Sequence, residues 1–150
     1  MTERRQVLMF LAAASCATLA SGNSAAVNTP TEKVLGIGGF FFRSTDPTAL
    51  ALWYQDNLGV APVPTDYHSQ PWKQEAGPTA FAPFPRDTKY FGAATQMFML
   101  NFRVRDLDKM VAQLEAKGIA VKVDPETYPN GRFAHLHDPD GNPLELWQPK

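Results

Sequence analysis

Residues 138–147 read DPDGNPLELW, and this stretch decides how the second half of the chain folds. Its first five positions combine proline, glycine, aspartate and asparagine, the residues that favour tight turns. Strands are expected on either side, at 132–137 and 143–148. The sequence therefore predicts a β-hairpin in which His137 faces Pro143 and His135 faces Glu145, with opposed residues on the same side of the sheet.

A repeat of about 60 residues extends this reasoning to the first half of the chain. FRSTD at 42–46 is echoed by FRVRD at 102–106, and apolar residues at helical spacing follow each copy. The aspartate that ends each copy stands where a helix N-cap is expected. Gly59 and Gly118 stand where a helix can end in the left-handed conformation.

The repeat predicts the element order βαβββ twice, as modules at about 34–86 and 97–149. The expected strands of the first module lie at 39–43, 60–65, 72–75 and 79–84, and those of the second at 97–104, 121–124, 132–137 and 143–148. Two such units have to cover each other's apolar sheet faces. We predict an α+β domain with a cleft on the side away from the helices.

The same residues resemble the vicinal-oxygen-chelate superfamily of glyoxalases, bleomycin resistance proteins and extradiol dioxygenases. The similarity rests on IGGF at 37–40, WYQDNLGV at 53–60, FRVRDLD at 102–108 and the DPDGN ending, and it covers nearly all of 34–149. It implies two βαβββ modules that form a cupped mixed sheet with helices on the outer face. Members include lyases, isomerases, epimerases, dioxygenases, glutathione transferases and antibiotic-sequestering proteins, so the fold alone does not give the function.

The resemblance also implies four metal-ligand positions, which fall on Gly39, Phe81, Met99 and Glu145. Only Glu145 offers a hard donor, because glycine and phenylalanine have none and methionine sulfur is soft. One carboxylate does not hold a catalytic divalent ion unaided. We therefore expect no cofactor and no glyoxalase activity, which needs a metal to stabilise an enediolate. A divalent metal held partly by His135 remains the alternative.

His135 and Glu145 are the candidate catalytic residues of the predicted cleft. The carboxylate would orient the imidazole and raise its basicity, which gives a general base near neutral pH. The alternative is a structural hydrogen-bond network without a catalytic role. The residues predicted to bind a ligand are Phe41, Phe81, Met99, Asn101, Arg103, Phe133 and Trp147.

The first 26 residues have the pattern of a bacterial export signal. Two arginines at 4–5 precede an apolar run at 7–20, and small residues at 24–26 fit a cleavage site. The run is too short to remain as a membrane span. The arginine pair resembles a twin-arginine signal, and acylation of Cys16 would instead make a lipoprotein. We expect a periplasmic or extracellular protein with a linker at 27–33 and one domain at 34–150.

The amino-acid composition limits the classes of partner that the chain can bind. The chain has 14 Lys and Arg against 15 Asp and Glu, so it lacks the basic field that nucleic acid requires. Its single cysteine, Cys16, precludes a disulfide within the domain. We therefore expect a small-molecule ligand, and a homodimer is compatible with the resemblance.

Three functions remain open from the sequence. The first is an exported protein that binds a small, partly apolar molecule without the usual metal. The second is a lyase, isomerase, epimerase or dioxygenase-like enzyme for a small oxygenated compound, with acid–base work by His135 and Glu145. The third is an interaction module with a vestigial cleft.

Overall fold

The computed structural model of the chain describes residues 32–150. They fall into two units, of which the first ends at Gly39 and the second runs from Phe40 to Lys150. The predicted export signal, with Cys16 and most of the linker, lies outside the described residues. Within the described part, no helix is long and apolar enough to cross a membrane.

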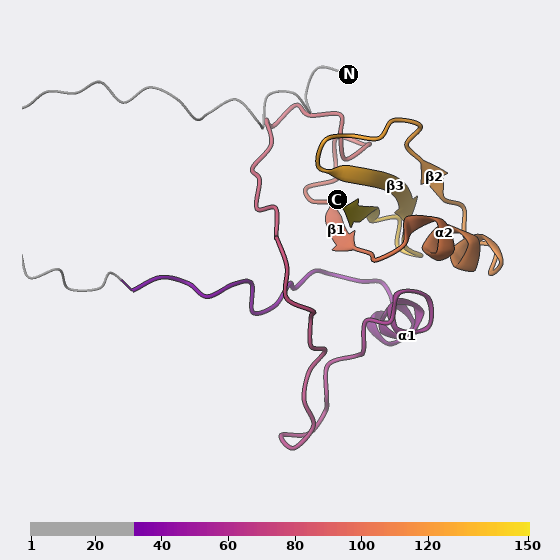
Figure 1. Ribbon diagram of the computed structural model, residues 1–150. Helices are drawn as coiled ribbons and strands as arrows, with labels where there is room; N and C mark the ends of the chain where they lie inside the picture. The colour runs from indigo at the N-terminus through magenta and orange to yellow at the C-terminus, as the bar shows by residue number, and fades with distance from the viewer. Residues whose placement is uncertain (1–31) are drawn as a thin grey trace, which may run out of the picture. The chain divides into compact units, whose positions relative to one another are not determined.

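The second half of the chain forms the predicted βαβββ unit. β1 (Leu100–Arg103) leads into α2 (Leu107–Glu115), and β2 (Lys122–Val123), β3 (Gly131–His137) and β4 (Pro143–Pro149) follow. The strands form one sheet in the order β1-β4-β3-β2. Figure 1 labels β1, β2 and β3 in the orange-to-yellow part of the chain. β1 runs parallel to β4 and the other neighbours are antiparallel. The mixed sheet with its helices confirms the α+β class.

The turn between β3 and β4 forms as the DPDGN sequence predicts. The backbone N–H of Asp138 donates to the carbonyl of Asn142 at 3.1 Å, and that of Gly141 donates to the carbonyl of Asp138 at 2.9 Å. The register opposes His135 to Glu145 and His137 to Pro143. Both predicted pairings are therefore confirmed.

Strand alternation sends the aliphatic residues of β3 and β4 toward the helices. Ala134, Leu136, Leu144 and Leu146 are buried together with residues of both helices. Full burial of each such leucine stabilises the fold by roughly 1.5–3 kcal/mol. The helix-side members of the core are Leu50, Tyr54, Leu107, Val111 and Leu114. The opposite side of the sheet, here called the open face, takes no part in this cluster.

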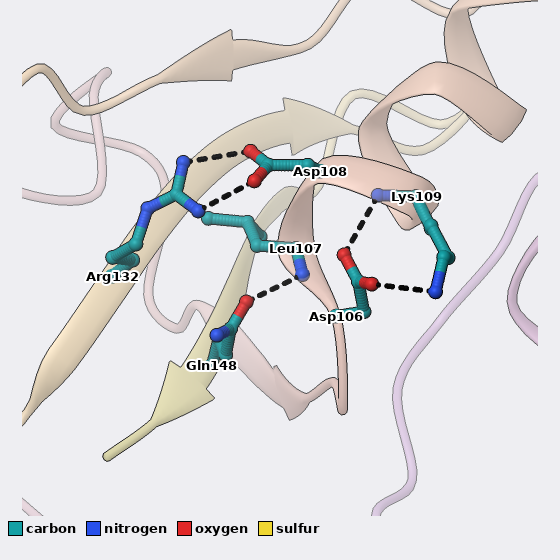
Figure 2. A network of polar contacts seen from close by, with 6 residues as sticks. All are labelled: Asp106, Leu107, Asp108, Lys109, Arg132 and Gln148. Atoms are coloured by element: carbon teal, nitrogen blue, oxygen red, sulfur yellow. Dashed lines mark hydrogen bonds and ion pairs between the residues drawn. The ribbon is translucent and has the colours of Figure 1, made fainter.

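Polar contacts fix the start of α2 against the sheet, as Figure 2 shows. Asp106 accepts from a first-turn backbone N–H at 3.0 Å and so acts as the predicted N-cap. Arg132 of β3 makes hydrogen bonds of 2.8 and 2.7 Å to Asp108, whose pKa it lowers. Gln148 of β4 accepts from the backbone N–H of Leu107 at 2.7 Å. These contacts join the helix to both strands of the hairpin.

In the first half, α1 (Pro47–Leu58) forms with the predicted ends. Asp46 accepts from the backbone N–H of Ala49 at 3.0 Å, and proline occupies the first helical position. Gly59 ends the helix with φ 70°, where glycine avoids the steric cost that other residues bear. In the second half α2 ends at Glu115, and Gly118 takes the predicted left-handed conformation, with φ 77°, in the turn that follows.

The turn between β3 and β4 also anchors α1. The buried hydroxyl of Tyr54 donates to Oδ2 of the buried Asp138 at 2.8 Å. Asn142 donates to the same carboxylate with its backbone N–H and its side-chain amide, each at 2.8 Å. Thr45, just before α1, donates to Asp140 at 3.1 Å. The turn motif thus has a second role, as the attachment point of the first helix.

The strands predicted for the first half do not form, and this prediction was wrong. Among the described residues before Leu100, α1 is the only helix or strand. Proline lies within the segments expected at 60–65 and 79–84 and directly before the one expected at 72–75, and it cannot donate to a strand ladder. Residues 71–83 are exposed throughout, so no apolar face is buried there to fix a register. Without those partners, 39–43 has no neighbouring strand either.

Two strands of the second half are shorter than predicted. β1 covers 100–103 of the expected 97–104, and β2 covers 122–123 of the expected 121–124. β2 pairs with β3 alone and lies at the sheet edge, so its ladder ends where the chain turns away.

Candidate functional site

A row of polar residues crosses the open face on all four strands. The register opposes Lys122 of β2 to His135 of β3, and His135 to Glu145 of β4. On the other side of β4, Asn101 of β1 is opposed to Glu145. Opposed residues share a face, so Lys122, His135, Glu145 and Asn101 form one line, called the polar row below.

Glu145 is the buried centre of the polar row, with 5% of its surface exposed. The side-chain amide of Asn101 donates to Oε1 at 2.6 Å, and the hydroxyl of Tyr90 donates to Oε2. His135 Nε2 lies 3.6 Å from Oε2. A buried carboxylate is costly unless it is hydrogen-bonded, and here both oxygens accept. These bonds fix the orientation of the carboxylate beside the imidazole.

Tyr90 is the site residue that the sequence analysis missed. It belongs to the segment 85–96, which lies between the last expected strand of the first module and the first of the second, where no helix or strand was predicted. Its ring stacks on Phe84 with a centroid distance of 5.5 Å, and it meets the ring of His135 edge-on at 5.9 Å. The nearby aromatics Phe84 and Phe91 were the only sequence signal for an ordered segment, and they do not identify its partner.

A cavity of about 420 Å³ lies at the open face. The segment 89–92 forms one wall. Met99, residues of the sheet and residues of the β2–β3 connection form the rest. Those that bear on its chemistry are Met99, Lys122, Asp124, His135, His137 and Pro143. The volume falls within the range of about 300–1,000 Å³ that is common for small-molecule sites. The cavity is therefore the candidate binding site.

Several predicted site residues meet at this place. Met99 and His135 line the cavity, and Glu145 with Asn101 supports it through the polar row. The predicted His–Glu pair is thus adjacent in space as well as in register. The carboxylate can hold the imidazole in place and stabilise its protonated form.

Phe133, Trp147 and Arg103 lie on the open face outside the cavity lining. The rings of Phe133 and Trp147 stack with a centroid distance of 6.2 Å and an interplanar angle of 3°. Trp147 Nε1 donates to the carbonyl of Asn130 at 2.8 Å. Arg103 donates to the carbonyl of Glu75 at 2.7 Å, so its guanidinium is directed at the chain rather than into the cavity.

Phe41 and Phe81 do not join the predicted site. Their exposed fractions are 91% and 87%, and neither lines the cavity. Both come from the first half, where the expected strands are missing, so nothing places them on a sheet face. Their prediction depended on that strand register.

Among the described residues, the four family metal positions do not bring a set of metal donors together. The β1 residue opposed to Glu145 is Asn101, while Met99 lies before the strand begins. Phe81 is exposed and has no donor atom. Within residues 32–150, no three His, Cys, Asp or Glu side chains are grouped to hold an ion. The donors present do not fit the divalent ion that the family implies.

Residues 39–147 match the family described as the glyoxalase-like domain, which is well over half of the chain. This chain belongs to that family. The match spans both halves of the sequence and confirms the resemblance drawn from its motifs.

Two relatives of this glyoxalase-like chain are uncharacterized proteins. It is 39% identical to YaeR of Escherichia coli over 69 residues, which are 44% of this chain and 52% of YaeR. It is 36% identical to YraH of Bacillus subtilis over 59 residues, which are 38% of this chain and 46% of YraH. The chain thus spans about half the length of these relatives.

One of the solved structures that this chain resembles is TnmS3, an antibiotic binding protein from Streptomyces sp. CB03234. The two are 39% identical over a region that covers 37% of this chain and 46% of TnmS3, and the TM-score is 0.33.

Proposed function

We propose that this glyoxalase-like chain binds a small, partly apolar molecule in the open-face cavity and needs no divalent metal to do so. The cavity of about 420 Å³ beside the polar row carries this proposal. Its size suits one small organic ligand, and its wall combines apolar groups with a few polar ones. Such a mixture excludes water and still orients the ligand.

The hydrogen bonds of Glu145 support a binding role without a metal. Its two oxygens accept from Asn101 and Tyr90, so the carboxylate holds the wall of the cavity together. A metal ion would have to share the carboxylate with both of these donors. Tyr90 in turn orders the segment that also carries Phe91, an apolar part of the lining.

The proposal includes export to the periplasm or the exterior. It rests on the charged, apolar and small-residue order of the first 26 residues, which is typical of a signal peptide. A ligand would then be met outside the cytoplasm.

The second candidate is an enzyme of the lyase, isomerase or epimerase type. His135 lines the cavity with Nε2 3.6 Å from Glu145 Oε2, and this geometry favours it. His135 would take a proton from a small oxygenated substrate, and Glu145 would stabilise the imidazolium that forms. Tyr90 shares the same carboxylate and would hold it in position.

Native mass spectrometry of the purified full chain tests the binding proposal. We expect a retained small molecule, or one bound from a panel of small oxygenated aromatic compounds, at one per chain. His135→Ala separates the two candidates, because lost turnover with retained binding identifies the enzyme. If no member of the panel binds and none is retained, the binding proposal fails.

Elemental analysis tests the absence of a metal requirement. After loading with Mn, Fe, Ni or Zn, we expect less than one ion per chain and ligand binding that chelators leave unchanged. Tight binding of one ion per chain, abolished by Glu145→Gln, would overturn this part of the proposal. His135 would then be tested as a second ligand.

A further inference from the structure

We propose that the ligand of the cavity is a small aromatic anion, whose charge lies near Lys89 and Lys122 and whose flat body lies against Tyr90, Phe91 and Met99. This inference rests on the proposed binding function and names the chemical class of the ligand. It depends on the charge of the cavity wall and on which element of the fold carries each charged residue.

The charged and titratable groups of the wall are mainly basic. Lys89, Lys122, His135 and His137 line the cavity, against Asp124 as the single acid. Within the described residues, neither lysine forms an ion pair. Two exposed ammonium groups at the wall of one cavity give it a positive potential, which attracts an anion. The wall therefore favours a negatively charged occupant.

The two acids near the cavity are both engaged with the protein. Asp124 accepts from the hydroxyl of Tyr128 at 3.0 Å. Glu145 lies outside the cavity lining, is buried, and accepts from two side chains. His135 lies between it and Lys122 in the polar row. The ligand thus meets the basic end of the row and not its acidic centre.

The lysines approach the cavity from two separate elements. Lys122 is carried by β2 at the sheet edge, beside His135. Lys89 directly precedes Tyr90, whose hydroxyl bonds to Glu145 and whose ring stacks on Phe84. Both positions are thus set by neighbouring contacts, although the ammonium groups themselves remain in water. We expect each to contribute about threefold to fivefold in affinity, as for partly exposed ion pairs.

The rest of the wall suits a flat apolar body. Phe91, Met99 and Pro143 line the cavity together with the ring of Tyr90. Aromatic rings and a thioether make favourable contacts with the face or edge of another ring. The volume of about 420 Å³ accommodates an aromatic molecule with one or two rings.

Two fluorescent probes that differ by one charged group test this inference. Anilinonaphthalene sulfonate carries an aromatic skeleton and a sulfonate, and N-phenyl-naphthylamine has the same skeleton without the charge. We would titrate the full chain with each and compare Lys89→Gln and Lys122→Gln with Lys73→Gln. Lys73 is exposed and does not line the cavity, so its variant matches the change in net charge.

We expect the sulfonate to bind at one site per chain, about tenfold more tightly than the neutral probe. Each cavity variant should weaken the sulfonate about threefold to fivefold, leave the neutral probe unchanged, and reduce the effect of added salt. Lys73→Gln should change neither probe. Met99→Trp, which fills the cavity, should weaken both.

The outcomes separate the inference from the function beneath it. If both probes bind equally, or if Lys73→Gln acts like the cavity variants, the anionic class is wrong while binding stands. If neither probe binds at one site, or if Met99→Trp leaves both unaffected, the proposed cavity function fails as well.

Discussion

Replacing Tyr54 with phenylalanine removes one hydroxyl from the contact between α1 and the β3–β4 turn. That hydroxyl donates to Asp138 at 2.8 Å, and both side chains are at least 94% buried. Asn142 still donates twice to the Asp138 carboxylate, so the buried acceptor keeps hydrogen-bond partners. A buried hydrogen bond to a charged group is worth about 1.5–3 kcal/mol. We expect Tyr54→Phe to lower the free energy of unfolding by about 2 kcal/mol at pH 7.

The same contact makes a pH-dependent prediction. Burial, followed by the hydrogen bond to Asp138, raises the pKa of Tyr54 well above its ordinary value of about 10. The stabilisation is therefore complete below pH 10, and it falls as pH rises further, because the unfolded chain loses this proton first. One proton gives a slope of about 1.4 kcal/mol per pH unit. Near pH 11 most of the difference between wild type and Tyr54→Phe should be gone.

Urea unfolding followed by tryptophan fluorescence at pH 7, 9, 10 and 11 measures both effects. Trp53 lies 5.2 Å from Tyr54 by ring centroids and reports on this region. Tyr67→Phe is the matched control, because Tyr67 is fully exposed and its variant should match wild type at every pH. Equal stability of Tyr54→Phe and wild type at pH 7, or a difference that does not shrink above pH 10, would refute the reasoning.

Four further substitutions give distinct outcomes in the same unfolding assay. Gly131→Ala should lower the free energy of unfolding by more than about 2 kcal/mol, because φ is 135° and a Cβ would lie 2.1 Å from a β4 carbonyl oxygen. Gly141→Ala should lower it by about 1 kcal/mol, because φ is 80° but the Cβ would stand in open space. Equal losses of stability for the two variants would contradict this. Glu145→Gln should lower the free energy of unfolding by about 1–3 kcal/mol, because the single oxygen of an amide cannot replace both carboxylate oxygens that accept from Asn101 and Tyr90. Wild-type stability of this variant would contradict the polar row. Arg132→Ala should lower the stability of the fold more at low salt than at high salt, because its partner Asp108 is exposed and salt screens the ion pair. A loss of stability that does not change with salt would contradict this.

Local chemistry made the second half of the chain predictable. The cap at Asp106, the turn at 138–142 and the opposition of His135 to Glu145 all follow from neighbours close in sequence. A hairpin with a fixed turn allows one register, and one register fixes the faces. The pairing of β1 with β4, which opposes Asn101 to Glu145, extends this His–Glu pair toward the full polar row.

The contact of Tyr90 with Glu145 was beyond the reach of sequence patterns. The two residues are 55 positions apart, and Tyr90 lies in a segment without periodicity. The first-half strands failed for a different reason, since they were inferred from the repeat and not from local propensity. Residues 71–83 contain proline and are exposed, so they form no strand although the repeat predicted strands there. Phe41 and Phe81 were lost from the site with those strands.

The geometry of the open face depends on contacts made on its other side. His135 and Glu145 are opposed only in one register of β3 and β4, and a slip of either strand by one residue would turn that strand's member of the pair toward the helices. Arg132 and Gln148, also opposed, bind the first turn of α2 from the helix side. At the far end the turn is held by Tyr54 through Asp138. The hairpin is therefore tied to a different helix at each end, so a change in either attachment should alter the cavity without touching a residue that lines it.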